Sequence, residues 1–91
     1  MAKQYSVELV KSAAKEFKKL PEKVKSQVVE TLGFLKQNPF SEVLKVKKLK
    51  GADSLYRIRL GNYRLVYEVR SKKLIVLVIK IGHRKDVYKK L

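Results

Sequence analysis

The strongest constraint on the fold of this chain is a hairpin signal between residues 55–60 and 63–70, which are joined by Gly61-Asn62. Gly-Asn is typical of a two-residue hairpin loop, and the length of the loop sets which residues of the two strands lie opposite each other. Alternate side chains of the two strands then form one apolar face, which consists of Tyr56, Ile58, Leu60, Tyr63, Leu65 and Tyr67. A slip of one residue in the register would turn this face away from the core.

The other face of the predicted hairpin carries arginines. Arg59 lies opposite Arg64, and Arg57 lies two residues further along the same face. Like charges directly opposite each other destabilise a strand pair, so this arrangement is costly for the fold alone. It indicates that the arginine face binds a polyanion.

The residues before the hairpin predict a strand followed by two helices. Residues 3–9 alternate in polarity, which is typical of a strand. From Val10 the apolar residues recur at helical spacing until Pro21, which ends the first helix and suits the first turn of the next. The second helix should stop at Asn38-Pro39. The two apolar stripes of this αα-hairpin are Val10, Ala13, Ala14, Phe17 and Leu20, and then Val24, Val28, Leu32 and Leu35.

Residues 40–54 form a connector that contains a lysine cluster, Lys45, Lys47, Lys48 and Lys50. Such a cluster is most often a solvated surface, but its position beside the arginine face makes contact with phosphates an equal alternative. Residues 74–81 are apolar on both faces and rich in β-branched side chains, which is typical of a central strand. We therefore expect an α+β fold of order βααβββ, with a twisted, mainly antiparallel sheet and the αα-hairpin on one face.

Composition limits the chain to a small and strongly basic protein. Its 91 residues suit a single domain over residues 1–91, and 23 Lys and Arg against 8 Asp and Glu give a formal charge of +15. This excess favours phosphate-rich or acidic partners. The sequence has no signal-peptide pattern and no apolar run near the ~20 residues needed to span a bilayer, so we expect a cytoplasmic protein without membrane contact.

Few kinds of chemistry are open to this sequence. It has one histidine, no cysteine, no carboxylates at metal-ligand spacing and no glycine-rich phosphate loop, so we expect neither a metal nor another cofactor. His83 and Arg84 follow the predicted last strand, so the tail can fold back towards the arginine face. The candidates for chemistry are then Arg57, Arg59, Arg64, His83, Arg84 and Tyr88.

This set suits cleavage of an RNA backbone, in which a ribose 2′-OH attacks the adjacent phosphate. Arginines can offset the charge on the phosphoryl oxygens, and histidine is the side chain that most readily exchanges a proton near neutral pH. Structural alternatives exist for three of the residues: His83 as a surface residue, Tyr88 as a cap on the core edge, and Arg84 as a partner of an acidic side chain (Asp86 or Glu68). Spacing alone favours a nucleic-acid-binding domain over an enzyme.

Four segments share their order and spacing with a known toxin family: residues 13–21, 47–51, 56–67 and 81–88. Together with the N-terminal strand, they resemble a RelE-type toxin of the RelE/ParE toxin–antitoxin superfamily. The resemblance covers essentially the whole chain. It implies a compact α+β fold and a toxin of a type II toxin–antitoxin system.

RelE-type toxins enter the ribosomal A site, formed by ribosomal RNA, and cut mRNA there, so the resemblance implies a metal-independent endoribonuclease that inhibits translation. A cognate RelB-like antitoxin neutralises them. The free toxin is then expected to be monomeric and the antitoxin complex to be of higher order. ParE-type toxins share the fold but inhibit DNA gyrase and cut no RNA. A gyrase inhibitor and a non-catalytic RNA-binding domain therefore stay open as alternatives.

The family's functional positions fall on Arg57, Arg59, Arg64, Arg84 and Tyr88. The better-known pattern has lysines at the first two positions, one of them proposed as the general base. Arginine hardly deprotonates, so this departure favours His83 as the base. Tyr88 would orient a nucleotide near the scissile phosphate or stack on it.

Overall fold

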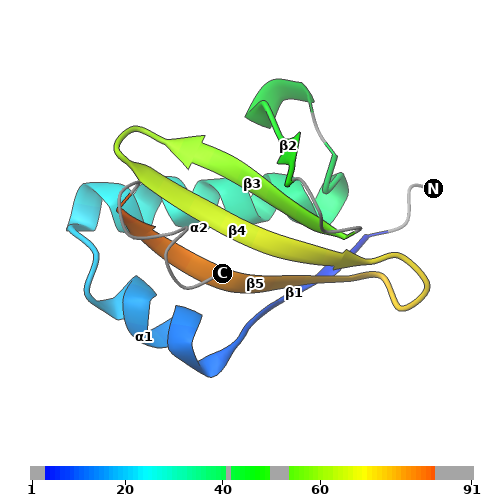
Figure 1. Cartoon of the computed structure of the whole chain (residues 1–91), viewed down its shortest axis with the longest axis horizontal. Helices are drawn as coiled ribbons and strands as arrows, with labels where there is room; N and C mark the ends of the chain where they lie inside the picture. Colours follow the sequence, from blue (N-terminus) through cyan, green and yellow to red (C-terminus); the bar gives the residue numbers. More distant parts are fainter. Residues whose placement is uncertain (1–3, 41, 50–53, 84–91) are drawn as a thin grey trace.

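The order of helices and strands follows the patterns in the sequence (Figure 1). The computed structural model describes residues 4–40, 42–49 and 54–83, so the predictions for Lys50, Arg84 and Tyr88 lie outside it. In chain order the elements are β1 (Ser6–Leu9), α1 (Lys11–Lys18), α2 (Glu22–Gln37), the 3-10 turn η1 (Glu42–Leu44), β2 (Lys47–Lys48), β3 (Leu55–Leu60), β4 (Tyr63–Arg70) and β5 (Ile75–His83). The predicted order βααβββ is confirmed, with β2 as one added short strand in the connector.

The strands form a mixed five-stranded sheet in the order β1-β5-β4-β3-β2. Only the pair of β1 and β5 is parallel, so the sheet is mainly antiparallel as predicted. In Figure 1, α2 passes behind β3 and β4, and α1 lies beside β5. The apolar stripes of both helices are thereby turned towards the sheet, which is the α+β arrangement expected from the sequence.

The hairpin of β3 and β4 has the register that its loop predicts. Arg59 pairs with Arg64, and Leu60 pairs with Tyr63. Gly61 takes a φ of 62° in the loop, a left-handed conformation that glycine adopts without steric penalty. The apolar and cationic faces of the hairpin are therefore on opposite sides of the sheet, as the sequence indicates.

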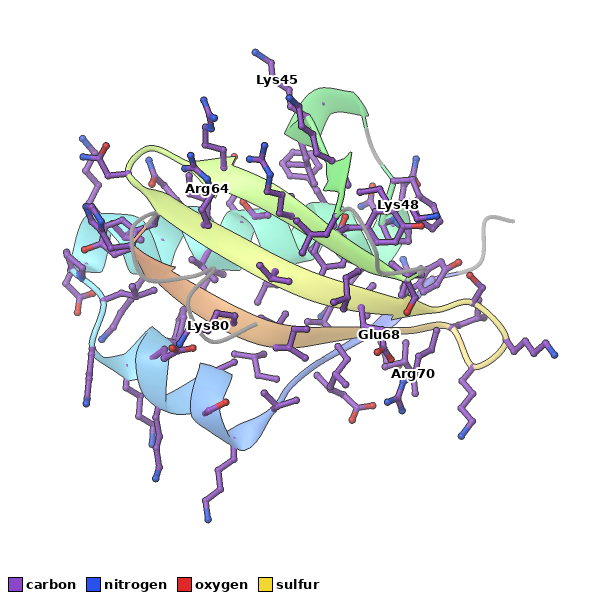
Figure 2. The ribbon with its side chains drawn as sticks, viewed as in Figure 1. Lys45, Lys48, Arg64, Glu68, Arg70 and Lys80 are labelled. Carbon is purple, nitrogen blue, oxygen red and sulfur yellow. The ribbon has the colours of Figure 1, made fainter. Side chains whose placement is uncertain are left out.

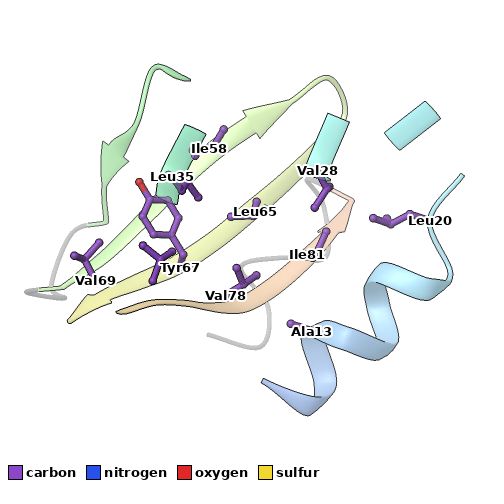
Figure 3. Packing of buried hydrophobic residues seen from close by; sticks show 11 residues of the cluster. Ala13, Leu20, Val28, Leu35, Ile58, Leu65, Tyr67, Val69, Val78 and Ile81 are labelled. Atoms are coloured by element: carbon purple, nitrogen blue, oxygen red, sulfur yellow. The ribbon is translucent and has the colours of Figure 1, made fainter. Parts of the chain in front are cut away.

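Side chains from both helices and from β3, β4 and β5 pack into one core (Figure 3). Its buried members are Ala13, Leu20, Val28, Leu35, Ile58, Leu65, Tyr67, Val69, Val76, Val78 and Ile81. Tyr56, Leu60 and Tyr63 pack against them, so all six residues of the predicted apolar face belong to this core. Of the predicted helical stripes, only Ala14 is outside it.

One buried polar contact fixes the core to the end of α2. The Tyr67 hydroxyl donates a hydrogen bond of 2.5 Å to the main-chain oxygen of Pro39, and both residues are fully buried. Burial, with a smaller effect of Tyr56, raises the pKa of Tyr67 above its ordinary value. The phenol therefore stays protonated and keeps donating this bond.

Element boundaries differ from the sequence prediction in two parts of the chain, the last strand and the N-terminal elements. The last strand continues through His83, two residues beyond the predicted end, because Gly82 and His83 still pair with β4. The pairing of β4 and β5 shifts between Val66 and Tyr67, whose partners are Lys80 and Val78. Such a bulge adds one residue to one strand and is not visible in an apolar run.

The second difference concerns the N-terminal elements. The first strand begins at Ser6 rather than at residue 3, which is outside the described residues. The first helix ends at Lys18, before Pro21, which is the N-terminal cap of α2. Neither helix in the described part of the chain is long and apolar enough to cross a membrane.

Candidate functional site

The arginine side of the hairpin is joined by lysines of the connector. Strand β2 pairs with β3 so that Lys47 is the partner of Arg57, next to the paired Arg59 and Arg64. Paired residues of neighbouring strands project to the same side of a sheet. We call the resulting surface, made of Lys45, Lys47, Arg57, Arg59 and Arg64, the cationic face.

The cationic face contains a cavity of about 210 Å³, whose described lining residues are Lys45, Lys47, Arg57 and Arg59. We call it the cationic cavity. Lys45 has a φ of 52°, which is unusual for a residue with a side chain and marks the sharp turn from η1 into β2. Because none of its described lining residues is a carboxylate, these residues leave its charge uncompensated, and an anion such as a phosphate group fits it.

Arg64 differs from the other described arginines because it is buried, with 6% of its surface exposed. Its Nη1 donates long hydrogen bonds to the main-chain oxygens of Tyr63 (3.3 Å) and Gly61 (3.4 Å). Its Nε has no hydrogen-bond partner among the residues that the structure describes. A buried donor without an acceptor is costly, so such a group usually has a partner, which can be an ordered water or a bound ion. An oxygen of a bound anion would satisfy it.

The predicted lysine cluster divides between two sides of the sheet. Lys45 and Lys47 line the cationic cavity. Lys48 is exposed too, but it pairs with Tyr56 of the apolar face and does not line this cavity. Figure 2 shows Lys45 near the end of the sheet where Arg64 lies, and Lys48 further along. The structure therefore brings two of the four predicted lysines to the site and leaves Lys50 outside the described residues.

The structure does not bring His83 to the cationic face. His83 is the pairing partner of Tyr63, whereas Arg64 pairs with Gly82. The His83 and Tyr63 rings meet edge to face, with centroids 5.7 Å apart. Since Tyr63 belongs to the apolar face, the sheet separates His83 from Arg64. The expectation that His83 folds towards the arginines is not met, because β5 extends through it.

The far end of the sheet has a different electrostatic character. The Arg70 Nε donates a 2.6 Å hydrogen bond to the Glu68 carboxylate (Figure 2). This hydrogen bond, with the charge of Glu68, raises the pKa of Arg70. Glu68, proposed above as a structural partner of Arg84, is thus already paired with Arg70. In residues 4–40, 42–49 and 54–83, positive charge without a paired carboxylate gathers at the hairpin end.

Sequence reasoning missed the role of Glu16. Its carboxylate forms an ion pair with Lys80 and accepts a 3.1 Å hydrogen bond from the main-chain N–H of Ile81. Strand β1 pairs with β5 only as far as Val78. Beyond that residue, the Glu16 carboxylate contacts β5 in place of a strand. The only signal in the sequence is that Glu16 is the one acidic residue in α1, among lysines.

The described residues contain no group of three or more His, Cys, Asp or Glu side chains that could hold a metal ion. The cationic face offers the N–H donors of its lysines and arginines. Their arrangement can hold a phosphodiester and stabilise negative charge that develops on it.

Comparison with known proteins places these features in a family. The model of the family described as "ParE toxin of type II toxin-antitoxin system, parDE" matches residues 7–88. The mRNA interferase toxin RelE of Escherichia coli K12 is 35% identical over 88 residues, which cover 92% of this chain and 90% of that protein.

Solved structures agree with this match. The crystal structure of the RelE–RelB complex from Pyrococcus horikoshii is similar with a TM-score of 0.80 and 31% identity, covering 92% of this chain and 99% of that chain. The isolated E. coli RelE toxin has a TM-score of 0.77 and 34% identity, covering 94% and 93% of the two chains. At these identities, sequence and fold point to the same relatives.

Proposed function

The chain belongs to the ParE toxin family of type II toxin–antitoxin systems, within the RelE/ParE superfamily, and from this premise we propose that it is a RelE-type toxin that cleaves mRNA in the ribosomal A site. The observation that carries the proposal is the buried Arg64, whose Nε–H has no acceptor in the described part of the chain, beside a cavity lined by four cations. A relative of 35% identity is named an mRNA interferase. The proposal treats residues 1–91 as a single RelE-like toxin domain.

In the proposed reaction, the 2′-oxygen of one ribose bonds to the adjacent phosphorus, and the bond from phosphorus to the next 5′-oxygen breaks. The products are a 2′,3′-cyclic phosphate and a 5′-hydroxyl. Negative charge builds on the non-bridging oxygens in the transition state. Arg57, Arg59 and Arg64 supply N–H donors for these oxygens, with Arg84 as a further donor carried over from the family pattern. No step of this scheme requires a metal ion.

The reaction also needs a base for the 2′-hydroxyl and an acid for the leaving 5′-oxygen. His83 was the candidate base in the sequence, but it lies on the other side of the sheet from Arg64. Arginines hardly deprotonate. We therefore assign proton transfer to Tyr88 or to a group of the ribosome, a division of labour in which the toxin supplies mainly charge and orientation.

The proposed partners follow from charge and from the relatives. The formal charge of +15 suits ribosomal RNA and mRNA, and it also suits an acidic antitoxin. The structure from P. horikoshii is a RelE–RelB complex, so we propose a RelB-like antitoxin as the cognate partner. The free toxin is proposed to be monomeric and to join a higher-order complex with this antitoxin.

A translation reaction with added protein, followed by mapping of mRNA ends, tests the proposal. We expect new 5′-hydroxyl ends at codons in the A site, and no cleavage when the nucleotide before the cut carries 2′-deoxyribose. Arg64→Ala should lower the single-turnover rate about 10²–10³-fold, because one preformed donor to the developing charge is lost. Intact mRNA with the native chain, or cleavage of the deoxy substrate, would overturn the mechanism.

Gyrase inhibition is the second candidate, because the matching family model is described as a ParE toxin. That function predicts DNA damage and unchanged mRNA in cells that express the chain. A non-catalytic RNA-binding domain predicts ribosome binding with intact mRNA and undamaged DNA. Measuring mRNA ends and DNA breaks in the same culture separates the three functions.

A further inference from the structure

A second cavity of about 460 Å³ adjoins the cationic face at the hairpin end, between α2, η1 and the start of the hairpin loop. Its lining consists of Gln27, Glu30, Thr31, Phe34, Val43, Leu44, Arg59, Leu60 and Gly61. We call it the α2 cavity. Its volume lies within the roughly 300–1,000 Å³ that is usual for small-ligand sites.

Arg59 lines both the α2 cavity and the cationic cavity. One arginine therefore lies between a site whose described lining residues are all cations and a larger site of mixed polarity. A nucleotide has the same two-part character, because its phosphate is anionic and its base is flat, largely apolar and edged with hydrogen-bonding groups. The two cavities could hold the two parts of a single nucleotide.

The walls of the α2 cavity suit an unpaired base. Phe34 is 41% exposed, which leaves ring surface on which a base can stack. Gln27 and Glu30, on the same helix, offer an amide and a carboxylate to the edge of a base. The Glu30 carboxylate also disfavours a second phosphate there, so charge assigns the base to the α2 cavity and the phosphate to the cationic cavity.

The main chain of β3 adds hydrogen-bonding groups at the boundary. Pairing with β2 ends at Arg57, so among the described residues the outer edge of β3 at Arg59 has no strand partner. Free N–H and C=O groups at a strand edge bind whatever offers a complementary edge. An extended protein segment could use this edge, but a protein segment would not account for the cationic cavity that continues from it through Arg59.

We propose that the α2 cavity binds one unpaired nucleobase of the RNA whose phosphate occupies the cationic cavity. The inference rests on the proposed RNA-cleaving function and adds a base-recognition subsite to it. Phe34 provides the stacking surface, and Gln27 and Glu30 contact the base edge. The subsite makes RNA binding depend on the identity of one base as well as on the backbone.

Titrations of the ¹⁵N-labelled full-length chain, followed by NMR, test the subsite without ribosomes. The probes are inorganic phosphate and the four ribonucleoside 5′-monophosphates. Phosphate alone should shift the amide signals of Lys47 and Arg57 only. Each monophosphate should shift these signals and also those of Phe34, Val43 and Gly61, with affinities that differ between bases.

Two matched substitutions on α2 sharpen the test. Phe34→Ala should weaken monophosphate binding about fivefold or more through loss of stacking, with phosphate binding unchanged. Val29→Ala is the control, because Val29 is also apolar and exposed on α2 but does not line this cavity. It should leave both affinities unchanged. If Val29→Ala weakens binding as much as Phe34→Ala does, the effect belongs to the helix as a whole and the subsite is refuted.

The inference would also be overturned if the monophosphates shift the same amide signals as inorganic phosphate, since the base would then lie outside the α2 cavity. An acidic peptide that shifts Phe34 and Gly61 when the monophosphates do not would assign the cavity to a protein partner instead. Failure of the proposed function is a different result: the mRNA would stay intact in translation reactions while these binding shifts persist.

Discussion

At the scale of single residues, the main feature of this protein is that side chains close in sequence are placed in very different surroundings. Arg59 is exposed and Arg64 is buried, although the two are paired across the hairpin. Burial makes the guanidinium of Arg64 a preorganised donor, while exposure leaves Arg59 able to line both cavities. Arg64 is thus suited to stabilising charge, and Arg59 is suited to binding the ligand.

His83→Ala tests the placement of the histidine. Because the ring lies against Tyr63 on the helix-facing side, we expect cleavage in a translation reaction to fall less than about threefold, far below the ~10²–10³-fold typical of a lost catalytic donor. Its pH–rate profile should match that of the native chain. A loss of pH dependence near neutrality would show that His83 is the general base after all, and would require β5 to rearrange on the ribosome.

Tyr67→Phe tests the buried hydrogen bond to Pro39. Removing the hydroxyl leaves a buried carbonyl without a donor, which should lower the free energy of unfolding by about 1–3 kcal/mol. Urea denaturation at pH 7 measures this difference. Tyr5→Phe, at a tyrosine only partly buried against the core, is the matched control and should change stability by less than about 0.5 kcal/mol.

The same bond has a defined pH dependence. The folded pKa of Tyr67 lies above the ordinary value of 10.0, so above about pH 10 the unfolded chain loses a proton that the folded chain keeps. Stability from this group is therefore fully present below that pH and declines as the pH rises further. The stability difference between the native chain and Tyr67→Phe should shrink above pH 10; a constant difference would contradict the raised pKa.

At the scale of elements, the position of the C-terminal part of β5 depends on a contact with helix α1. Strand β1 pairs with β5 only up to Val78, and the carboxylate of Glu16 then binds both Lys80 and the Ile81 N–H. A helix side chain thus replaces a strand partner at the segment of β5 that pairs with Leu65 and Val66, directly before the pair of Gly82 and Arg64. Helix α1 supports the site without contributing a residue to the cationic face.

Glu16→Ala should therefore loosen the end of β5. We expect a loss of about 1–3 kcal/mol in the free energy of unfolding, because an ion pair and a main-chain hydrogen bond are lost together. Amide exchange at Ile81 should accelerate. Glu22→Ala is the control: Glu22 pairs with Lys25 at 3.5 Å but its side chain is 91% exposed, so it should cost less than about 1 kcal/mol. Equal losses for the two variants would argue against the role of Glu16.

At the scale of the whole molecule, two helices cover one side of a compact sheet. On the other side of the sheet, cations that have no paired carboxylate among the described residues gather at the hairpin end. The 8 acidic side chains of the sequence offset only part of its 23 lysines and arginines and leave a formal net charge of +15. This distribution draws polyanions towards the hairpin end, where the cationic cavity and the buried Arg64 lie. Long-range attraction and local recognition therefore act at the same place.

RNA binding should weaken steeply with salt. If the five side chains of the cationic face each neutralise one phosphate, log K falls with log salt at a slope of about −3.5, and binding weakens roughly 100-fold between 50 and 200 mM salt. Fluorescence anisotropy with a labelled single-stranded RNA measures the slope. A variant with Lys47→Ala should have a slope smaller by about 0.7. Salt-independent binding would exclude the cationic face as the RNA interface.

The sequence alone determined the local geometry of this protein. The loop Gly61-Asn62 and the strict alternation around it predict the register of β3 and β4, which the structure confirms pair by pair. The helical stripes and the proline at residue 21 likewise predict both helices and their buried sides. These features depend on the period of side chains along a helix or strand, and that period is a property of neighbouring residues.

Only the tertiary structure decided how far each side chain is buried and which distant groups meet. The burial of Arg64, the side of the sheet taken by His83, the division of the lysines by β2 and the contact of Glu16 with Lys80 were not visible in the sequence. Glu16 and Lys80 are 64 positions apart, and the bulge in β5 changes which face each later residue takes. Such contacts depend on packing between elements, and no local pattern encodes that packing.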